Sequence, residues 1–91
     1  MAPPYDLLER MRRSKAGWRA RDLERLYVGF GFHLTEGSKH TVYRHPKYKE
    51  LRATVKRADP IPTGYVVTAV RLVDALITLQ ASEADDNAES Q

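Results

Sequence analysis

The chain has 91 residues, enough for one small domain but too few for a multidomain enzyme. It contains no cysteine, which excludes a disulfide framework and a thiolate metal site. The net charge of +3 is uneven: all 15 Lys and Arg precede residue 81, whereas four of the 12 acidic residues follow it, so residues 1–80 carry +7. A compact domain with this charge attracts polyanions, most commonly nucleic acid, although a solvated basic surface is the plain alternative.

Two short amphipathic helices are predicted in the first third of the chain. Apolar residues at near-helical spacing after Pro3 and Pro4 predict a helix over residues 5–13. The sequence "SKAG" interrupts it. A second helix is predicted over residues 20–30, because four apolar side chains there form one stripe at positions i, i+3, i+4 and i+7: Leu23, Leu26, Tyr27 and Phe30.

Three strands are predicted next. The segment "FHLTE" (residues 32–36) precedes a "GSK" turn, and "HTVYRH" (residues 40–45) is rich in β-branched and aromatic residues and ends at Pro46. The segment "LRATVKR" (residues 51–57) alternates apolar and polar residues, which is typical of a strand with one buried face and one solvated, basic face.

A Pro-rich break, "ADPIPTG", separates the strands from an apolar segment over residues 65–80. Its apolar residues recur at helical spacing, so an amphipathic helix is predicted despite its many β-branched residues. Arg71 and Asp74 interrupt the apolar run and argue against a membrane span. The N-terminus lacks the apolar core of a signal peptide. A cytoplasmic protein that does not contact membranes is expected.

The predicted order is therefore ααβββα, an α+β fold with a three-stranded antiparallel sheet and helices on one face. Residues 1–80 are interpreted as a single domain, with residues 5–19 as an N-terminal helical extension and residues 20–79 as its core. Residues 81–91 carry acids and few apolar side chains, so an acidic disordered tail is expected there.

Strand alternation places His40 and Arg44 on one face of the second strand, opposite to Tyr43. If Tyr43 packs under the helices, His40 and Arg44 point to the open face, where the third strand adds Arg52 and Lys56. Cations at such a face can hold phosphate, and a neutral imidazole can take a proton from a ribose 2′-hydroxyl. The pattern thus indicates a phosphodiester site with His40 as general base.

The plainer interpretation is that His40 is an ordinary surface histidine. His33 and His45 look more ordinary still, and His45 either faces the core or ends its strand before Pro46. A metal site built from the three histidines would need side chains from both faces of the sheet, so no metal and no cofactor are expected. Trp18 and Tyr48 could stack on bases, although a single tryptophan after a helix is more often in the core.

The segment "EGSKHTVYRHP" resembles the signature of HicA-type mRNA interferase toxins, which reads Gly-Ser-x-His followed after two residues by an aromatic. "DLERLYVGFGF" looks like the helix that precedes the histidine strand in that family. "RATVKRADPIPTGYVVTAVRLVDAL" looks like its last strand, loop and closing helix, and "DLLERMRRSKAGWRARDL" is similar to an added N-terminal segment. The resemblance covers roughly residues 5–79.

This resemblance implies a double-stranded-RNA-binding-domain-like fold. It also implies the toxin of a type II toxin–antitoxin system: a metal-independent endoribonuclease, a hydrolase that cleaves mRNA and is neutralised by a HicB-type antitoxin. The family's essential histidine corresponds to His40, and its turn glycine to Gly37. The expected RNA contacts, from the residues and the resemblance together, are Gly37, Ser38, Lys39, Arg44, Arg52 and Lys56.

Two other functions stay open on the sequence. A non-catalytic RNA-binding module would need the same basic face, with His40 only as a hydrogen-bonding group. A protein-interaction domain would use that face to meet an acidic partner. The general acid of a cleavage reaction is not identifiable from the sequence; His33 or His45 would be candidates only if the assignment of the strand faces failed.

Overall fold

The computed structural model describes residues 3–89, and for residues 85–89 the backbone alone. Two helices, three strands and a long helix follow one another in the predicted order. They are α1 (Tyr5–Arg13), α2 (Ala20–Gly29), β1 (His33–Glu36), β2 (His40–Arg44), β3 (Arg52–Lys56) and α3 (Thr63–Glu89). Apart from the end of α3, their bounds lie close to those predicted from hydrophobic spacing.

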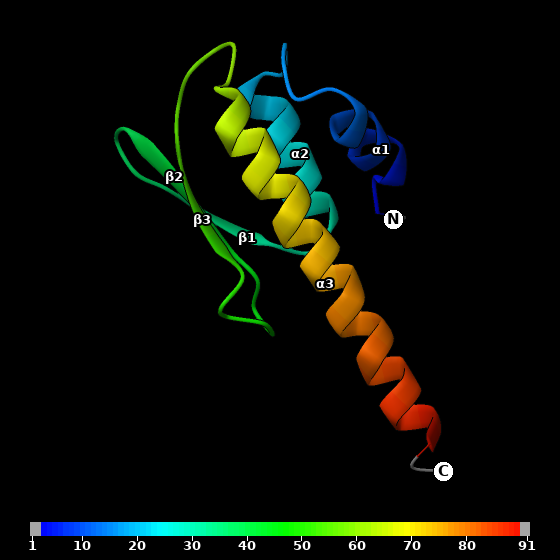
Figure 1. Cartoon of the computed structure of the whole chain (residues 1–91). Helices are drawn as coiled ribbons and strands as arrows, with labels where there is room; N and C mark the ends of the chain where they lie inside the picture. Colours follow the sequence, from blue (N-terminus) through cyan, green and yellow to red (C-terminus); the bar gives the residue numbers. More distant parts are fainter. Residues whose placement is uncertain (1–2, 90–91) are drawn as a thin grey trace.

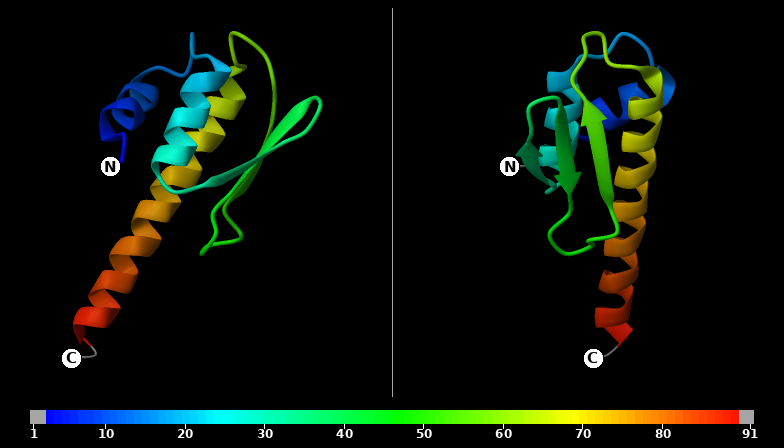
Figure 2. Two further views of the ribbon diagram at one scale, coloured as in Figure 1. Left: turned by 180° about the vertical axis from the view of Figure 1, so that it is seen from behind. Right: turned by 90° about the vertical axis from the view of Figure 1, so that its left-hand side faces the viewer.

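The three strands form one antiparallel sheet in the order β1-β2-β3. Helices α2 and α3 lie side by side on one face of this sheet, and α1 packs on the far side of the helices (Figure 1). No helix or strand among residues 3–89 covers the other face, as the right-hand view of Figure 2 shows. The prediction of an α+β fold with helices on one face of a three-stranded antiparallel sheet is confirmed.

The core lies between the sheet and the helices. Strands β2 and β3 alternate strictly between buried and more exposed residues, so each contributes every second side chain to the core. The buried strand residues on the helical side are Thr41, Tyr43, Ala53 and Val55. The apolar stripe predicted on α2 is buried as a whole: Leu23, Leu26, Tyr27 and Phe30.

Aromatic rings connect α2 to the middle of the sheet. Tyr27 of α2 stacks on Tyr43 of β2, with ring centroids 4.4 Å apart, and meets Phe32 edge-on at 5.0 Å. Phe32 in turn contacts the ring of His45 at 5.3 Å. Because aromatic pairs of this kind add stabilisation beyond their buried area, they help to hold β2 in a defined register on the helices.

Helix α3 forms despite its β-branched residues because tertiary packing buries one stripe of it. That stripe comprises Val66, Ala69, Val70, Val73 and Leu76. By length and composition, the segment Thr63–Ala84 would suffice to cross a membrane, with a mean hydropathy of 1.3. A single helix of this kind is weak evidence of a membrane span, and 28% of its apolar window is buried in the structure.

The acidic tail differs from its prediction. Helix α3 continues to Glu89, past the sheet (Figure 1), so the backbone of residues 81–89 is helical rather than disordered; residues 90 and 91 lie outside the described residues. Two physical reasons support the extension. Ala81 and Ala84 are strong helix formers, and the Glu83 carboxylate accepts a 2.7 Å hydrogen bond from Lys47 Nζ in the β2–β3 connection.

The N-terminal segment is docked onto the helical layer. Leu7, Leu8 and Met11 of α1 are buried, and the Arg12 guanidinium pairs with the Asp74 carboxylate of α3. The Trp18 indole donates a 2.8 Å hydrogen bond to the Ser14 carbonyl oxygen. Residues 5–19 therefore pack on the helices, away from the open face of the sheet.

Candidate nucleic-acid interface

The open face of the sheet carries the residues that alternate with the buried ones. His40, Arg44, Arg52 and Lys56 are all exposed, whereas Tyr43, Ala53 and Val55 are buried against the helices. This agrees with the strand faces assigned from the sequence. The strand residues of this face are His33 and Thr35 of β1, His40, Val42 and Arg44 of β2, and Arg52, Thr54 and Lys56 of β3.

His40 begins β2, and its direct partner on β3 is Lys56. Directly opposite residues of an antiparallel pair have Cβ atoms about 5 Å apart. The Lys56 ammonium group and the His40 imidazole are therefore neighbours on the open face, where a ligand can contact both. One phosphate can contact both, with the cation on a phosphate oxygen and the imidazole on a neighbouring hydroxyl.

A tight turn leads into His40. The Gly37 backbone N–H donates a 2.8 Å hydrogen bond to the His40 carbonyl oxygen, and the Arg57 N–H donates a 3.2 Å bond to the Lys39 carbonyl oxygen. A Cβ atom at Gly37 would lie 3.2 Å from that His40 oxygen, closer than an ordinary contact. Glycine therefore lets the turn approach His40 closely. The neighbouring Ser38 and Lys39 are exposed at this end of the face.

Arg44 and Arg52 form a second pair at the opposite end of the face. They are direct partners on β2 and β3, and His33 of β1 is the partner of Arg44 on its other side. At about 3.3 Å per residue, Arg44 lies ~13 Å along the strand from His40. The predicted RNA contacts are thus split into two groups: Lys56 accompanies His40, whereas Arg44 and Arg52 accompany His33.

On the open face, the strands carry basic side chains and no acidic ones. Among the ion pairs of the described residues, none involves Lys39, Arg44, Arg52 or Lys56. Arg57, by contrast, pairs with Glu36 at 3.4 Å. The unpaired cations of the open face leave a positive potential that attracts anions and is sensitive to salt.

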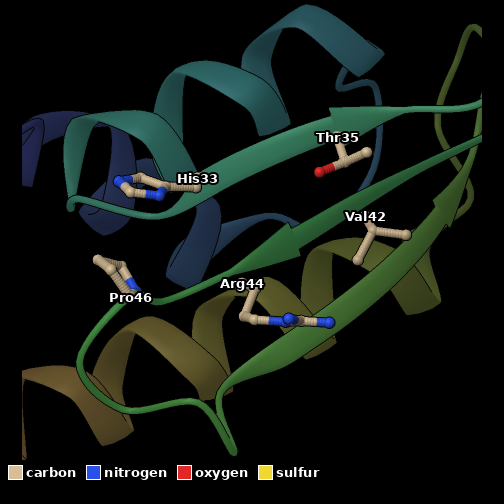
Figure 3. Close-up of a pocket in the computed structure, with 5 residues that line it drawn as sticks. All are labelled: His33, Thr35, Val42, Arg44 and Pro46. Atoms are coloured by element: carbon tan, nitrogen blue, oxygen red, sulfur yellow. The ribbon is translucent and has the colours of Figure 1, made fainter.

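A shallow hollow of about 250 Å³ lies at the His33 end of the face (Figure 3). The residues that line it come from β1, β2 and the residue after β2: His33, Thr35, Val42, Arg44 and Pro46. Figure 3 shows the His33 and Pro46 rings at one end of the hollow and the Arg44 side chain alongside. Its lining combines the apolar side chains of Val42 and Pro46 with polar groups and the Arg44 cation.

His45 lies on the opposite side of the sheet from His40. Its ring is buried between Phe32 and Tyr48, and its Nδ1 accepts backbone hydrogen bonds from Lys47 at 3.1 Å and Tyr48 at 3.3 Å. Burial, and then the nearby His33 and Lys47, lower the pKa of His45. Through these hydrogen bonds the His45 side chain holds the β2–β3 connection in place, and it does not reach the open face.

Neither of the two aromatic residues considered for base stacking lies on the open face. Trp18 is half-buried, with the Arg10 guanidinium 5.8 Å from its ring centre, and Tyr48 packs on His45. Among the side chains that the structure describes, residues 3–84, no group of three or more His, Asp or Glu is placed to hold a metal ion.

His33 is the residue of this face that the sequence interpretation underrated. The signal was nevertheless present: Phe32 and Leu34 are apolar neighbours of a short strand, so His33 and Thr35 between and after them belong to the other face.

Comparison with known proteins adds no identification: no family model matches the chain, and neither a curated protein nor a solved structure matches it significantly. The functional inference therefore rests on the residues and their geometry.

Proposed function

We propose that the protein is a ribonuclease toxin of the HicA type, with a double-stranded-RNA-binding-domain-like fold, that acts in the cytoplasm. The observation that carries the proposal is the exposed His40 directly opposite Lys56, on a sheet face that has cations and no acids. The resemblance of "EGSKHTVYRHP" to the signature of that family supports the same chemistry at the same histidine.

In the proposed reaction, the His40 imidazole takes the proton of a ribose 2′-hydroxyl, and Lys56 binds a non-bridging oxygen of the adjacent phosphate. The 2′-oxygen bonds to phosphorus while the bond to the 5′-oxygen breaks, which leaves a 2′,3′-cyclic phosphate and a 5′-hydroxyl end. His33 lies too far from His40, ~13 Å along the sheet, to protonate that same 5′-oxygen. Solvent can supply the proton at this open site.

The test is cleavage of a labelled mRNA in excess EDTA by the parent protein and by His40→Ala, with folding checked by circular dichroism. Binding of both proteins to a 2′-O-methyl RNA, which has no free 2′-hydroxyl, serves as the control. Cleavage by the parent alone, with cyclic phosphate ends and similar binding by both, supports the proposal.

Two outcomes contradict it. If neither protein cleaves but both bind RNA equally, the sheet is a non-catalytic RNA-binding surface, which is the second candidate. If RNA affinity is no better than that of an unrelated protein of equal charge and collapses with modest salt, the face is one that meets an acidic protein partner.

The proposal includes a HicB-type antitoxin as the neutralising partner. An acidic segment of that antitoxin would cover the open face, because carboxylates can occupy the sites that phosphates take on Lys56 and Arg52. A structure of the complex with the partner on the helical side and His40 accessible would contradict this mode of neutralisation.

A further inference from the structure

We propose that the hollow beside His33 is a nucleotide subsite, which receives one unpaired base of a single-stranded RNA whose phosphate lies on Arg44 and Arg52. This rests on the proposed function for the identity of the ligand, but it concerns a different part of the sheet from His40. It assigns to His33 the role of a stacking platform.

The arrangement of His33, Arg44 and Arg52 across the three strands supports a binding site. His33, Arg44 and Arg52 are consecutive cross-strand partners on β1, β2 and β3, so their side chains line one row across the open face. The two guanidinium groups can hold a phosphate with several donors. Neither pairs with a carboxylate among the described residues.

The hollow has the dimensions and surface for a single base. Its volume of about 250 Å³ lies below the ~300–1,000 Å³ of typical pockets for drug-sized ligands. The exposed imidazole of His33 is one of the rings on which RNA-binding proteins stack bases, and Pro46 and Val42 add apolar surface. Thr35 supplies a hydroxyl.

The spacing defines the kind of RNA. The row lies ~13 Å along the sheet from His40, which corresponds to about four nucleotides of a stacked strand at ~3.4 Å each and to fewer in an extended one. A base can enter the hollow only if it is unpaired, since a duplex keeps its bases stacked inside. A single strand that spans both ends of the face is therefore the ligand that fits.

The experiment measures the affinity of all-2′-O-methyl oligonucleotides of two to eight residues by fluorescence anisotropy at constant salt. The affinity of the parent should rise about tenfold or more at the length that first reaches the hollow, the size expected of one stacked base. The variants His33→Ala and Arg52→Gln should not show this rise of affinity at that oligonucleotide length. His33→Phe, which keeps a stacking ring, should retain it. Arg71→Gln, which removes the same charge from the exposed side of α3, should retain it too.

A smooth increase of affinity with length, equal in all variants, would overturn the subsite, as would His33→Phe behaving like His33→Ala. Displacement of the oligonucleotide by polyglutamate of equal charge, with equal affinity, would also overturn it in favour of an acidic protein ligand. Because the probes cannot be cleaved, the outcome is independent of the ribonuclease test: a protein that does not cleave RNA can show this rise of affinity, and one that cleaves can lack it.

Discussion

His40 and Lys56 are direct partners on the β2–β3 ladder, and both side chains are exposed on the face of the sheet opposite to helices α2 and α3. The pairing follows from the buried neighbours of the two residues. Thr41 and Val55, the next pair along the ladder, pack on the helical side. A shift of β2 by one residue would turn His40 toward the core and expose Thr41 and Tyr43, so packing on one face determines the chemistry of the other.

Lys56→Gln should weaken RNA binding several-fold and lower the slope of log affinity against log salt by about one, because one phosphate contact is lost. The stability of the protein should not change, since Lys56 is exposed. Lys49→Gln removes the same charge from the β2–β3 connection and is the matched control. Equal losses in both variants would show that net charge alone matters, without a specific role for the partner of His40.

The stability of the protein should decrease as the pH falls below about 6.5, the ordinary pKa of histidine. Burial lowers the pKa of His45, so the unfolded chain takes up the proton more readily than the folded one. The contribution of His45 is fully present above the unfolded pKa and is lost as the pH drops toward the folded one. Electrostatic repulsion from the nearby His33 and Lys47 lowers the pKa of His45 in the same direction.

His45→Asn tests this assignment, because an Asn oxygen can accept the backbone bonds that Nδ1 accepts but does not titrate in this range. Urea unfolding between pH 7 and 5.5 should show a smaller loss of stability in His45→Asn than in the parent. His40→Asn, an exposed control, should keep the dependence of the parent. If the stability of His45→Asn depended on pH as strongly as that of the parent, the titrating group would be a residue other than His45.

Tyr27→Phe should leave the free energy of unfolding unchanged within about 1 kcal/mol, or raise it. The Tyr27 hydroxyl is buried without a hydrogen-bond partner among the described residues, so its removal eliminates an unsatisfied group. Tyr27→Ala should cost about 3–5 kcal/mol, because the stack on Tyr43 and the core packing are lost. A larger cost for Tyr27→Phe in urea unfolding would indicate that the hydroxyl has a partner in solution.

Two glycines in helices should respond in opposite ways to alanine. A Cβ at Gly29 would lie 2.4 Å from Pro4 Cδ, so Gly29→Ala must displace the start of α1 and should lower the melting temperature. At Gly64 nothing lies within 4 Å, and Gly64→Ala should stabilise the protein by up to about 1 kcal/mol. Equal shifts in thermal unfolding would argue that α1 does not pack on Gly29 as described.

Local patterns were sufficient for most of the fold. The apolar stripe of α2 and the alternation of residues 51–57 are properties of short segments, and the buried residues follow them closely. The end of α3 was mispredicted because composition alone suggested disorder after residue 80. The contact from Glu83 to Lys47 joins residues far apart in the chain, and no local pattern contains it.

The candidate site also combines features that local sequence patterns predict with features that depend on contacts between distant segments. Alternation along each strand predicts that His40, Arg44, Arg52 and Lys56 lie on the solvent face, because the apolar residues between them are the ones that need burial. Which of these four residues are neighbours depends on how the three strands pair. The register of three strands places Lys56 beside His40 and moves Arg44 and Arg52 to the far end with His33. Register depends on packing between segments that are distant in sequence, so this grouping is visible only once the sheet has formed.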